Sequence, residues 1–444
     1  MPKSRTITII ICVCGAFLLL QFIGLKFIFD KVNPKQFLEE LPPWDAVKLF
    51  LSKCEASGLA VFVIEPSLLR AVRESSLRRV ELWNQEHHDS VAFGVIEPGL
   101  DKLHLVLSAM KQHSYDFWEK NDPDPRGMTA FSRKSYRVIS THCLLWVPLE
   151  GHTPMLIHLV VFYKRGSYLW HAAGQDNLHV PPYSLAESYF AKTPGSYSLF
   201  EMSMVYIDGV QLQFPNDTYT FLKEMETSEF IECNYTRAYN FYSVYHLDKS
   251  KQVEVFKRKS RQLLLTVKNI LDSMGVRFWL SSGTCLGWFR QCDFISHTTD
   301  VDIGIFIREY REELVGFLEN SGLVLTHRFG RVNDSFELSF LYGDVKLDIF
   351  FFYVTEDHIW NGGTQASSGK KYKYIFPKFE LCWAEFLELL IRVPCPPEPY
   401  ISANYGPKWM IPKLAWDWKS SPSNVIENGR WPEKEWDEVI QLYA

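Results

Sequence analysis

Three aspartates in the second half of the chain have the spacing of a site for a hard divalent cation. Asp300 and Asp302 stand two residues apart in an alternating apolar run, so both carboxylates point to one face of a predicted strand. Asp348 lies on a later strand that we expect to be a neighbour of the first. Such carboxylates repel one another unless a cation lies between them, and Mg²⁺ or Mn²⁺ prefers their oxygens. We therefore predict that these three residues bind Mg²⁺ or Mn²⁺ and act in catalysis.

A segment of small residues precedes the first aspartates and is suited to binding phosphate. The apolar run 278–280 predicts a buried strand that ends in Ser-Ser-Gly-Thr, where small side chains let backbone N–H groups approach a ligand. We expect the backbone of Gly283 and Thr284, with the planar fork of Arg290, to hold phosphate oxygens. Together with one or two cations, such a site neutralises a diphosphate during in-line displacement. An Asp-x-Asp strand alone is equally typical of a solvated face, and the combination favours catalysis.

Regular elements are predicted on both sides of these residues. Apolar residues at helical spacing over 256–274 predict a long helix. Two alternating runs, 336–342 and 345–351, predict a hairpin around Gly343. Asp348 faces away from the apolar residues of the return strand, as Asp300 and Asp302 do on theirs. The three carboxylates converge if this hairpin pairs with the earlier strand.

The first half of the chain alternates short apolar runs with helical patterns. Apolar runs at 59–64, 91–96, 155–163 and 204–212 predict strands, and 100–110 predicts a helix between them. Strands alternating with helices place the chain in the α/β (α+β) class. We find no catalytic constellation in this half. Its most obvious polar candidates are interpreted as surface or hydrogen-bonded core histidines: His87, His88, His158 and His171.

The N-terminus carries an uncharged run of 20 residues, 6–25. A helix of about 20 apolar residues spans a bilayer, so this run predicts a membrane anchor. A cleaved signal peptide is the alternative, but its apolar part is usually shorter and ends in a small-x-small site, which is missing here. The basic residues Lys3 and Arg5, which precede the run, favour a cytosolic N-terminus. We therefore predict a single-pass type II protein whose remaining chain lies in the lumen of the secretory pathway.

Two further features bear on a luminal location. Sequons for N-glycosylation begin at Asn216, Asn234 and Asn333. Seven cysteines lie outside the anchor, an odd number, so at least one must be free, metal-bound or paired between chains. Cys382 and Cys395 either pair or bind zinc, and their spacing supports neither alternative.

Composition bounds the class of protein without naming its chemistry. The chain has 444 residues, of which 47% are hydrophobic and 15% aromatic, and this excludes a disordered, collagen-like or coiled-coil protein. Its 47 basic and 52 acidic residues give a net charge of −5. This balance argues against binding nucleic acid through a broad basic face.

The motifs around the aspartates resemble the LicD branch of the nucleotidyltransferase fold, whose members transfer phospho-alcohol groups from CDP-linked donors. The matching residues are Ser281, Gly283, Thr284, Leu286, Gly287, Arg290, Ile295, Asp300, Asp302 and Asp348, with Phe376, Pro377, Tyr405, Gly406, Trp409 and Pro412 downstream. More closely, 278–306, 338–378 and 416–443 look like the fukutin family of ribitol-5-phosphate transferases. The resemblance extends over nearly all of the chain after the anchor.

This resemblance implies a reaction and a place for it. CDP-ribitol would donate ribitol 5-phosphate to the N-acetylgalactosamine of the O-mannosyl core trisaccharide of α-dystroglycan, releasing CMP. Asp300 and Asp302 would hold the metal, and Asp348 would be the third ligand or the base for the acceptor hydroxyl. The protein would sit in the Golgi membrane beside other O-mannosyl glycan enzymes, including fukutin-related protein. The implied divisions are a cytosolic tail (1–5), a transmembrane signal-anchor (6–29), a stem linker (30–44), an α/β domain (45–250) and a nucleotidyltransferase-like, mixed-sheet catalytic domain (251–444).

Three points stay open at the level of sequence. Thr298 replaces an acid often found two residues ahead of the Asp-x-Asp, which leaves open the number of metal ions and whether His297 is a ligand. We count Lys371 among the donor-binding residues, because it follows a glycine-rich stretch, but an exposed lysine-rich hairpin tip fits equally well. Two other functions compete with the transferase: a catalytically silent Golgi scaffold for glycosylation enzymes, and an Asp-x-Asp sugar-nucleotide glycosyltransferase.

Overall fold

The computed structural model describes residues 43–443, except 75–89, 130–136, 147–155, 175–178, 181–182, 185–188, 208–209, 247 and 249. The predicted tail, membrane anchor and most of the stem therefore lie outside the described residues, as do His87 and His88. Within the described part, no helix has the length and apolar character needed to cross a bilayer. The predicted mixture of α and β structure is confirmed in both halves of the chain.

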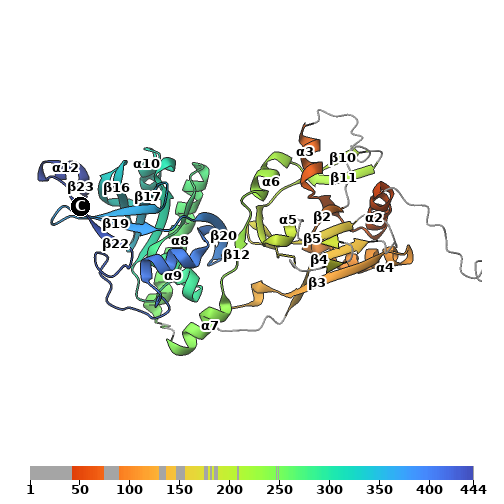
Figure 1. The fold of residues 1–444 in the computed structure, drawn as a ribbon, viewed down its shortest axis with the longest axis horizontal. Helices are drawn as coiled ribbons and strands as arrows, with labels where there is room; N and C mark the ends of the chain where they lie inside the picture. Colours follow the sequence, from red (N-terminus) through yellow and green to blue (C-terminus); the bar gives the residue numbers. More distant parts are fainter. Residues whose placement is uncertain are drawn as a thin grey trace, which may run out of the picture.

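The first half builds a mixed sheet with the strand order β1-β2-β5-β4-β3, extended from β5 by β6 and β9. The pair β2–β5 is parallel, and β4 pairs with β5 antiparallel. The strands are β1 (Val61–Val63), β2 (Ser90–Ile96), β3 (Asp116–Pro123), β4 (Val138–Trp146), β5 (Leu156–Arg165), β6 (Tyr168–His171) and β9 (Gly195–Ser198). Around them lie α2 (Pro43–Ser57), α3 (Pro66–Glu74), α4 (Leu103–Gln112), α5 (Tyr189–Lys192) and α6 (Thr218–Met225), with α2 against α4 and α3 against α6 (Figure 1).

One strand prediction in this half is wrong. The run 204–212 forms parts of two strands, β10 (Met202–Ile207) and β11 (Val210–Pro215), which pair antiparallel with each other. The sequence has Asp-Gly between them, and this dipeptide is the strongest short-range signal for a hairpin. Met204 and Tyr206 are exposed on β10, so the apolar run reflects an uncovered face.

The second half centres on a nine-stranded sheet in which most pairings are antiparallel. Its strands are β13 (Phe278–Leu280), β14 (Asp300–Phe306), β15 (Val324–Arg331), β16 (Asp334–Tyr342), β17 (Val345–Val354), β18 (Ile359–Gln365), β19 (Lys370–Phe376), β22 (Val425–Arg430) and β23 (Ile440–Leu442). A separate antiparallel pair is β20 (Glu380–Phe386) and β21 (Leu389–Cys395). The helices are α8 (Lys251–Ser273), α9 (Ser282–Gln291), α10 (Leu314–Asn320), α11 (Pro397–Tyr405) and α12 (Trp436–Val439).

The predicted long helix and hairpin are confirmed in this half. Helix α8 begins where the Ser250 hydroxyl accepts a hydrogen bond from the Val253 N–H, and it buries Leu263, Leu264, Val267 and Leu271. Strands β16 and β17 pair antiparallel around Gly343, which has a φ of +64°. Their alternating apolar side chains belong to the same buried core as the helix. One sheet face is thereby buried, which leaves the other for polar side chains.

The two halves meet through a short strand and a helix that precede the second sheet (Figure 1). Strand β12 (Phe230–Ile231) pairs in parallel with β20, and helix α7 (Tyr235–Val244) contacts α9. The buried guanidinium of Arg165 on β5 forms an ion pair with Glu232, at 2.9 Å between Nη1 and Oε2. Strand β12 is thus hydrogen-bonded to the second half, and the neighbouring Glu232 is ion-paired with the first.

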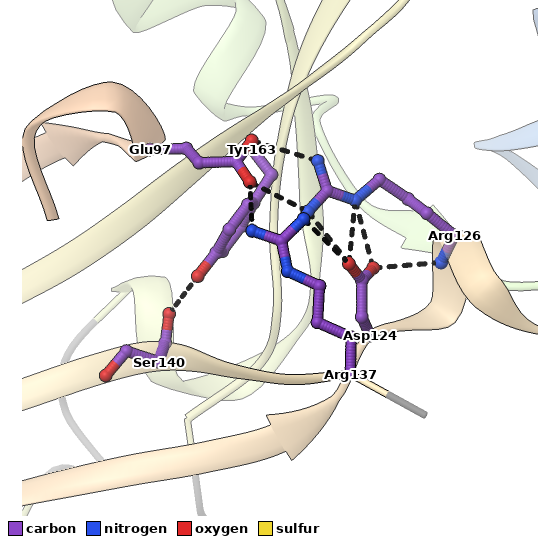
Figure 2. Close-up of polar contacts among 6 residues, drawn as sticks. All are labelled: Glu97, Asp124, Arg126, Arg137, Ser140 and Tyr163. Carbon is purple, nitrogen blue, oxygen red and sulfur yellow. Dashed lines mark hydrogen bonds and ion pairs between the residues drawn. The ribbon is translucent and has the colours of Figure 1, made fainter. Parts of the chain in front are cut away.

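A network of charged side chains lies beside strands of the first sheet (Figure 2). The guanidinium of Arg126 donates to both carboxylate oxygens of Glu97, at 2.9 and 3.0 Å, and to the buried carboxylate of Asp124. Arg137 adds a 2.9 Å ion pair to Glu97, and the Arg126 guanidinium lies 4.9 Å from the Tyr163 ring centroid. The hydrogen bonds from Arg126 lower the pKa of Glu97. Arg126 is therefore the shared partner of two carboxylates.

We expect Arg126→Ala to lower the free energy of unfolding by about 3 kcal/mol, because it leaves the Asp124 charge buried without its main partner. The matched control is Arg137→Ala, whose side chain is 62% exposed and should cost less than about 1 kcal/mol. Urea unfolding at neutral pH measures both. Equal effects of the two changes would contradict a special role for Arg126.

Candidate functional site

The three predicted aspartates converge on one face of the second sheet. Strands β14 and β17 pair in parallel with Asp302 directly opposite Asp348, and Asp300 stands two residues earlier on β14. Each of the three offers a carboxylate oxygen, and these oxygens lie within 4.8 Å of one another. Asp302 and Asp348 are buried, at 6% and 5% exposure. The alternating pattern thus placed all three carboxylates correctly.

The first turn of α9 holds Asp302 in place. The Gly283 and Thr284 N–H groups donate to Asp302 Oδ2 at 2.9 and 3.3 Å, and the Asp302 N–H donates to Thr284 Oγ1 at 2.8 Å. The sequence predicts that these backbone N–H groups hold phosphate oxygens. In the structure they bind the aspartate, because α9 begins at Ser282 and its unpaired N–H groups face the end of β14. Gly283 and Thr284 therefore position Asp302.

The other two carboxylates also have fixed partners. The Thr298 hydroxyl donates to Asp300 Oδ1 at 2.5 Å. Thr298, which replaces an acid often found at this position, therefore orients the carboxylate of Asp300. The Ser339 hydroxyl donates to Asp348 Oδ1 at 2.5 Å, and Lys346 Nζ lies 2.9 Å from Asp348 Oδ2. Hydrogen bonds of this kind orient the carboxylates of a metal site.

The aspartates carry more negative charge than their surroundings compensate. Burial raises the pKa of Asp302 well above its usual value, and the charges of Asp300 and Asp348 raise it further. Burial also raises the pKa of Asp348, although Lys346 opposes that effect. A divalent cation would remove this repulsion, and the all-oxygen donor set suits Mg²⁺ or Mn²⁺. The residues present therefore fit the predicted ion, with Asp300, Asp302 and Asp348 as its ligands.

The aspartates line a cavity of about 580 Å³. His297 also lines it, although it is not part of the aspartate cluster within the described residues. Arg290 lines the cavity too, but its buried guanidinium donates to Gln291 Oε1 at 2.8 Å and faces the Phe241 ring at 4.5 Å. Burial lowers the pKa of Arg290 to about 10. The guanidinium is thus held by protein groups, and its N–H donors are not all free to bind a phosphate.

The structure does not bring Lys371 to this cavity. Its ammonium lies 2.6 Å from Asp334 Oδ2 and 4.2 Å from the centroid of the Trp431 ring. Lys371 lies on β19, opposite Thr364 of β18. Its charge is engaged in an ion pair on the sheet, so donor binding by Lys371 has no geometric support.

Two charged residues of the cavity were not predicted from the sequence. Glu337 lies on β16, two residues before Ser339, and burial raises its pKa to about 8, with the Asp348 charge adding to the effect. Lys346 lies two residues before Asp348 on β17. Both follow from the same alternation that places Asp348, since positions two apart on a strand share a face. The hairpin pattern therefore contained the signal for both residues.

The cysteines and sequons of the described part are also placed. Cys382 pairs with Cys395 rather than binding zinc, and a second disulfide joins Cys233 to Cys292. Three described thiols are free and buried: Cys54, Cys143 and Cys285. The sequon asparagines Asn216, Asn234 and Asn333 are exposed. Asn234 also caps α7, where its side-chain oxygen accepts from the Arg237 N–H at 2.8 Å.

Comparison with known families matches both halves of the chain. A family model described as Fukutin N-terminal matches residues 21–261, and one described as LicD/FKTN/FKRP, nucleotidyltransferase domain, matches residues 275–396. The second match contains all three aspartates of the cluster.

Individual relatives agree with the family models. The chain is 41% identical over 421 residues to Ribitol-5-phosphate transferase FKTN of Mus musculus, covering 90% of this chain and 88% of that protein. It is 37% identical over 467 residues to the Homo sapiens protein of the same name, covering 99% of each. An uncharacterized protein of Caenorhabditis elegans is 32% identical over 245 residues, which cover 52% of this chain and 62% of that protein. The chain therefore belongs to the fukutin family and carries that family's LicD-type nucleotidyltransferase domain in its second half.

Proposed function

We propose that this protein is a ribitol-5-phosphate transferase that uses CDP-ribitol and releases CMP. The observation that carries the proposal is the cluster of Asp300, Asp302 and Asp348 in a cavity large enough for a nucleotide-linked donor. Two relatives, matched by this chain over 88% and 99% of their lengths, are named Ribitol-5-phosphate transferase FKTN. Their names support the same assignment. The proposed acceptor is the N-acetylgalactosamine of the O-mannosyl core trisaccharide of α-dystroglycan.

The reaction is a single displacement at phosphorus. An acceptor hydroxyl oxygen forms a bond to the phosphorus of ribitol 5-phosphate, the bond from that phosphorus to the oxygen of CMP breaks, and the hydroxyl proton passes to a carboxylate of the cavity. Asp300, Asp302 and Asp348 would hold Mg²⁺ or Mn²⁺, which neutralises diphosphate charge when bound. Thr298 and Ser339 fix the orientation of two of these carboxylates. The bonds from Ser339 and Lys346 fix the carboxylate of Asp348. We therefore assign Asp348 as a metal ligand rather than as the base for the acceptor hydroxyl.

The proposed location is the Golgi membrane, in a single-pass type II orientation with the catalytic half in the lumen. The uncharged run 6–25 and the exposed sequon asparagines support it. The two disulfides support an oxidising compartment as well. We further propose that the protein works beside other O-mannosyl glycan enzymes, including fukutin-related protein.

The full-length protein in detergent provides the test of this function. Incubated with CDP-ribitol, Mn²⁺ or Mg²⁺ and a glycopeptide carrying the core trisaccharide, it should release CMP and add the mass of ribitol phosphate to the glycopeptide. Chelation of the divalent cation should stop the release. UDP- and GDP-sugars serve as competing donors. Transfer of a sugar from one of these, with CDP-ribitol left intact, would favour an ordinary glycosyltransferase instead.

A further inference from the structure

The charges that line the cavity are divided between two walls. Its four acidic residues, Asp300, Asp302, Glu337 and Asp348, all come from strands β14, β16 and β17. A second wall comes from the end of α11 and the segment 406–422 that follows it. Within the described residues, this second wall contributes two lysines and several aromatic rings to the cavity, and no acid.

Lys408 and Lys413 are the charged residues of the second wall, and both are exposed. Among the residues that the structure describes, neither forms an ion pair or a hydrogen bond through its side chain. The other strong cations that line the cavity are engaged, since Arg290 donates to Gln291 and Lys346 pairs with Asp348. Two free ammonium groups at one wall create a positive potential that attracts an anion.

Aromatic rings line the same wall as the two lysines. Trp416 and Trp418 line the cavity with 37% and 39% exposure, whereas Trp279 and Trp288 are buried in the core. The Trp416 ring lies 4.9 Å from that of Tyr405, and Lys413 Nζ lies 5.4 Å from the Trp416 centroid. Both rings are partly exposed, and stacking of a flat base or a sugar on an exposed aromatic ring favours binding.

The second wall is also held in position. The Tyr374 hydroxyl of β19 donates to the Trp418 carbonyl at 2.9 Å. The Tyr372 ring of the same strand lies edge-on to the Trp418 ring, with centroids 5.3 Å apart. A fixed aromatic surface loses little conformational entropy when a ligand binds to it.

Building on the proposed function, we propose that Lys408, Lys413 and Trp416 form a second subsite of the cavity. It binds a phosphate ester next to a ring: the lysines hold the phosphate, and the ring lies against Trp416. Two molecules could bring this chemistry, the nucleotide of the donor or a phosphorylated acceptor glycan. The subsite would then set the affinity for that substrate, whereas the aspartates carry out the transfer.

The test uses the full-length protein with both lysines replaced, Lys408→Gln together with Lys413→Gln. The control replaces Lys378 and Lys434 by Gln, which makes the same charge change at two exposed lysines outside the cavity. Calorimetry measures the binding of CMP and, separately, of a glycopeptide bearing a phosphorylated sugar. Neither measurement requires turnover, so failure of the transferase proposal would still leave the subsite testable.

We expect the lysine pair to weaken one of these ligands about tenfold or more, while the control pair changes neither by more than about twofold. Weaker CMP binding, with a matching rise in KM for CDP-ribitol, identifies the donor as the source. Unchanged CMP binding with weaker glycopeptide binding identifies the acceptor. Trp416→Leu should weaken the same ligand, and Trp416→Phe should largely preserve its binding. If both ligands bind the lysine variant as they bind the wild type, or if the wild type binds neither, the subsite proposal is overturned.

Discussion

Asp302→Asn is expected to lower the rate of ribitol-phosphate transfer by about a thousandfold or more. Asp302 is buried, with Asp348 opposite it and two N–H groups of α9 bonded to one of its oxygens. Replacing it removes a negative charge from the predicted metal site. A loss of several kcal/mol of charge stabilisation corresponds to this change in rate.

The same substitution should leave the fold intact. An asparagine side-chain oxygen can still accept from the Gly283 N–H, and removing the charge relieves the repulsion from Asp300 and Asp348. The thermal midpoint in a chelator should therefore be unchanged or higher, while the rise that Mn²⁺ causes in the wild type should be lost. A matched control is Asp344→Asn, which changes an exposed aspartate in the turn between β16 and β17 and should keep activity within about twofold.

This substitution also separates the enzyme from the scaffold. Cells that lack the protein and receive the Asp302→Asn form should show no α-dystroglycan glycosylation if catalysis is the function. Restored glycosylation by a stable but inactive variant would instead favour a scaffold that recruits other enzymes. The Asp344→Asn form should restore glycosylation under either hypothesis, which controls for expression.

The sequence was most informative where one face of a strand is buried. The alternation on β14 and β17 fixed which side chains leave the core, and the short turn at Gly343 fixed the register of the hairpin. Asp300, Asp302 and Asp348 were therefore predictable as a group. Glu337 was equally predictable, because it shares one face of β16 with Ser339.

The sequence was least informative where a long-range contact decides local structure. Helix α9 begins at Ser282, inside the segment of small residues, because a carboxylate about twenty residues later accepts its first N–H groups. Arg290 has a suitable side chain for phosphate, but folding places Gln291 and the Phe241 ring around it. The second wall of the cavity follows no period, so its lysines and tryptophans could not be assigned to the site in advance.

The first-half sheet is expected to lose stability steeply below neutral pH, because it buries a row of histidines. His142 Nδ1 lies 3.0 Å from His158 Nε2, and the Ala172 carbonyl accepts from both His142 Nε2 and His171 Nδ1 at 2.9 Å. All three imidazoles are buried. Burial lowers the pKa of His158 to about 3 and that of His171 to about 4. Few water molecules can reach a proton placed on these rings.

The direction of the pH effect follows from those depressed pKa values. In the unfolded chain a histidine binds a proton near pH 6.5, whereas His158 and His171 stay neutral in the folded sheet down to about pH 4. Between these limits the unfolded state binds more protons, so the stability from neutral histidine is present above pH 6.5 and falls as the pH falls. At pH 5, each of these two histidines should lower the free energy of unfolding by about 2 kcal/mol relative to its value at pH 7.

Urea unfolding at a series of pH values, followed by tryptophan fluorescence, measures this loss. His171→Leu should reduce the drop in unfolding free energy between pH 7 and pH 5 by about 2 kcal/mol, whatever its effect at pH 7. The matched control is His104→Leu, which removes an exposed imidazole of α4 in the same half and should leave the slope unchanged. Because the readout is a slope, lost packing alone would shift both ends of the curve and leave it parallel to the wild type. A parallel curve for His171→Leu would therefore show that His171 does not contribute to the acid sensitivity.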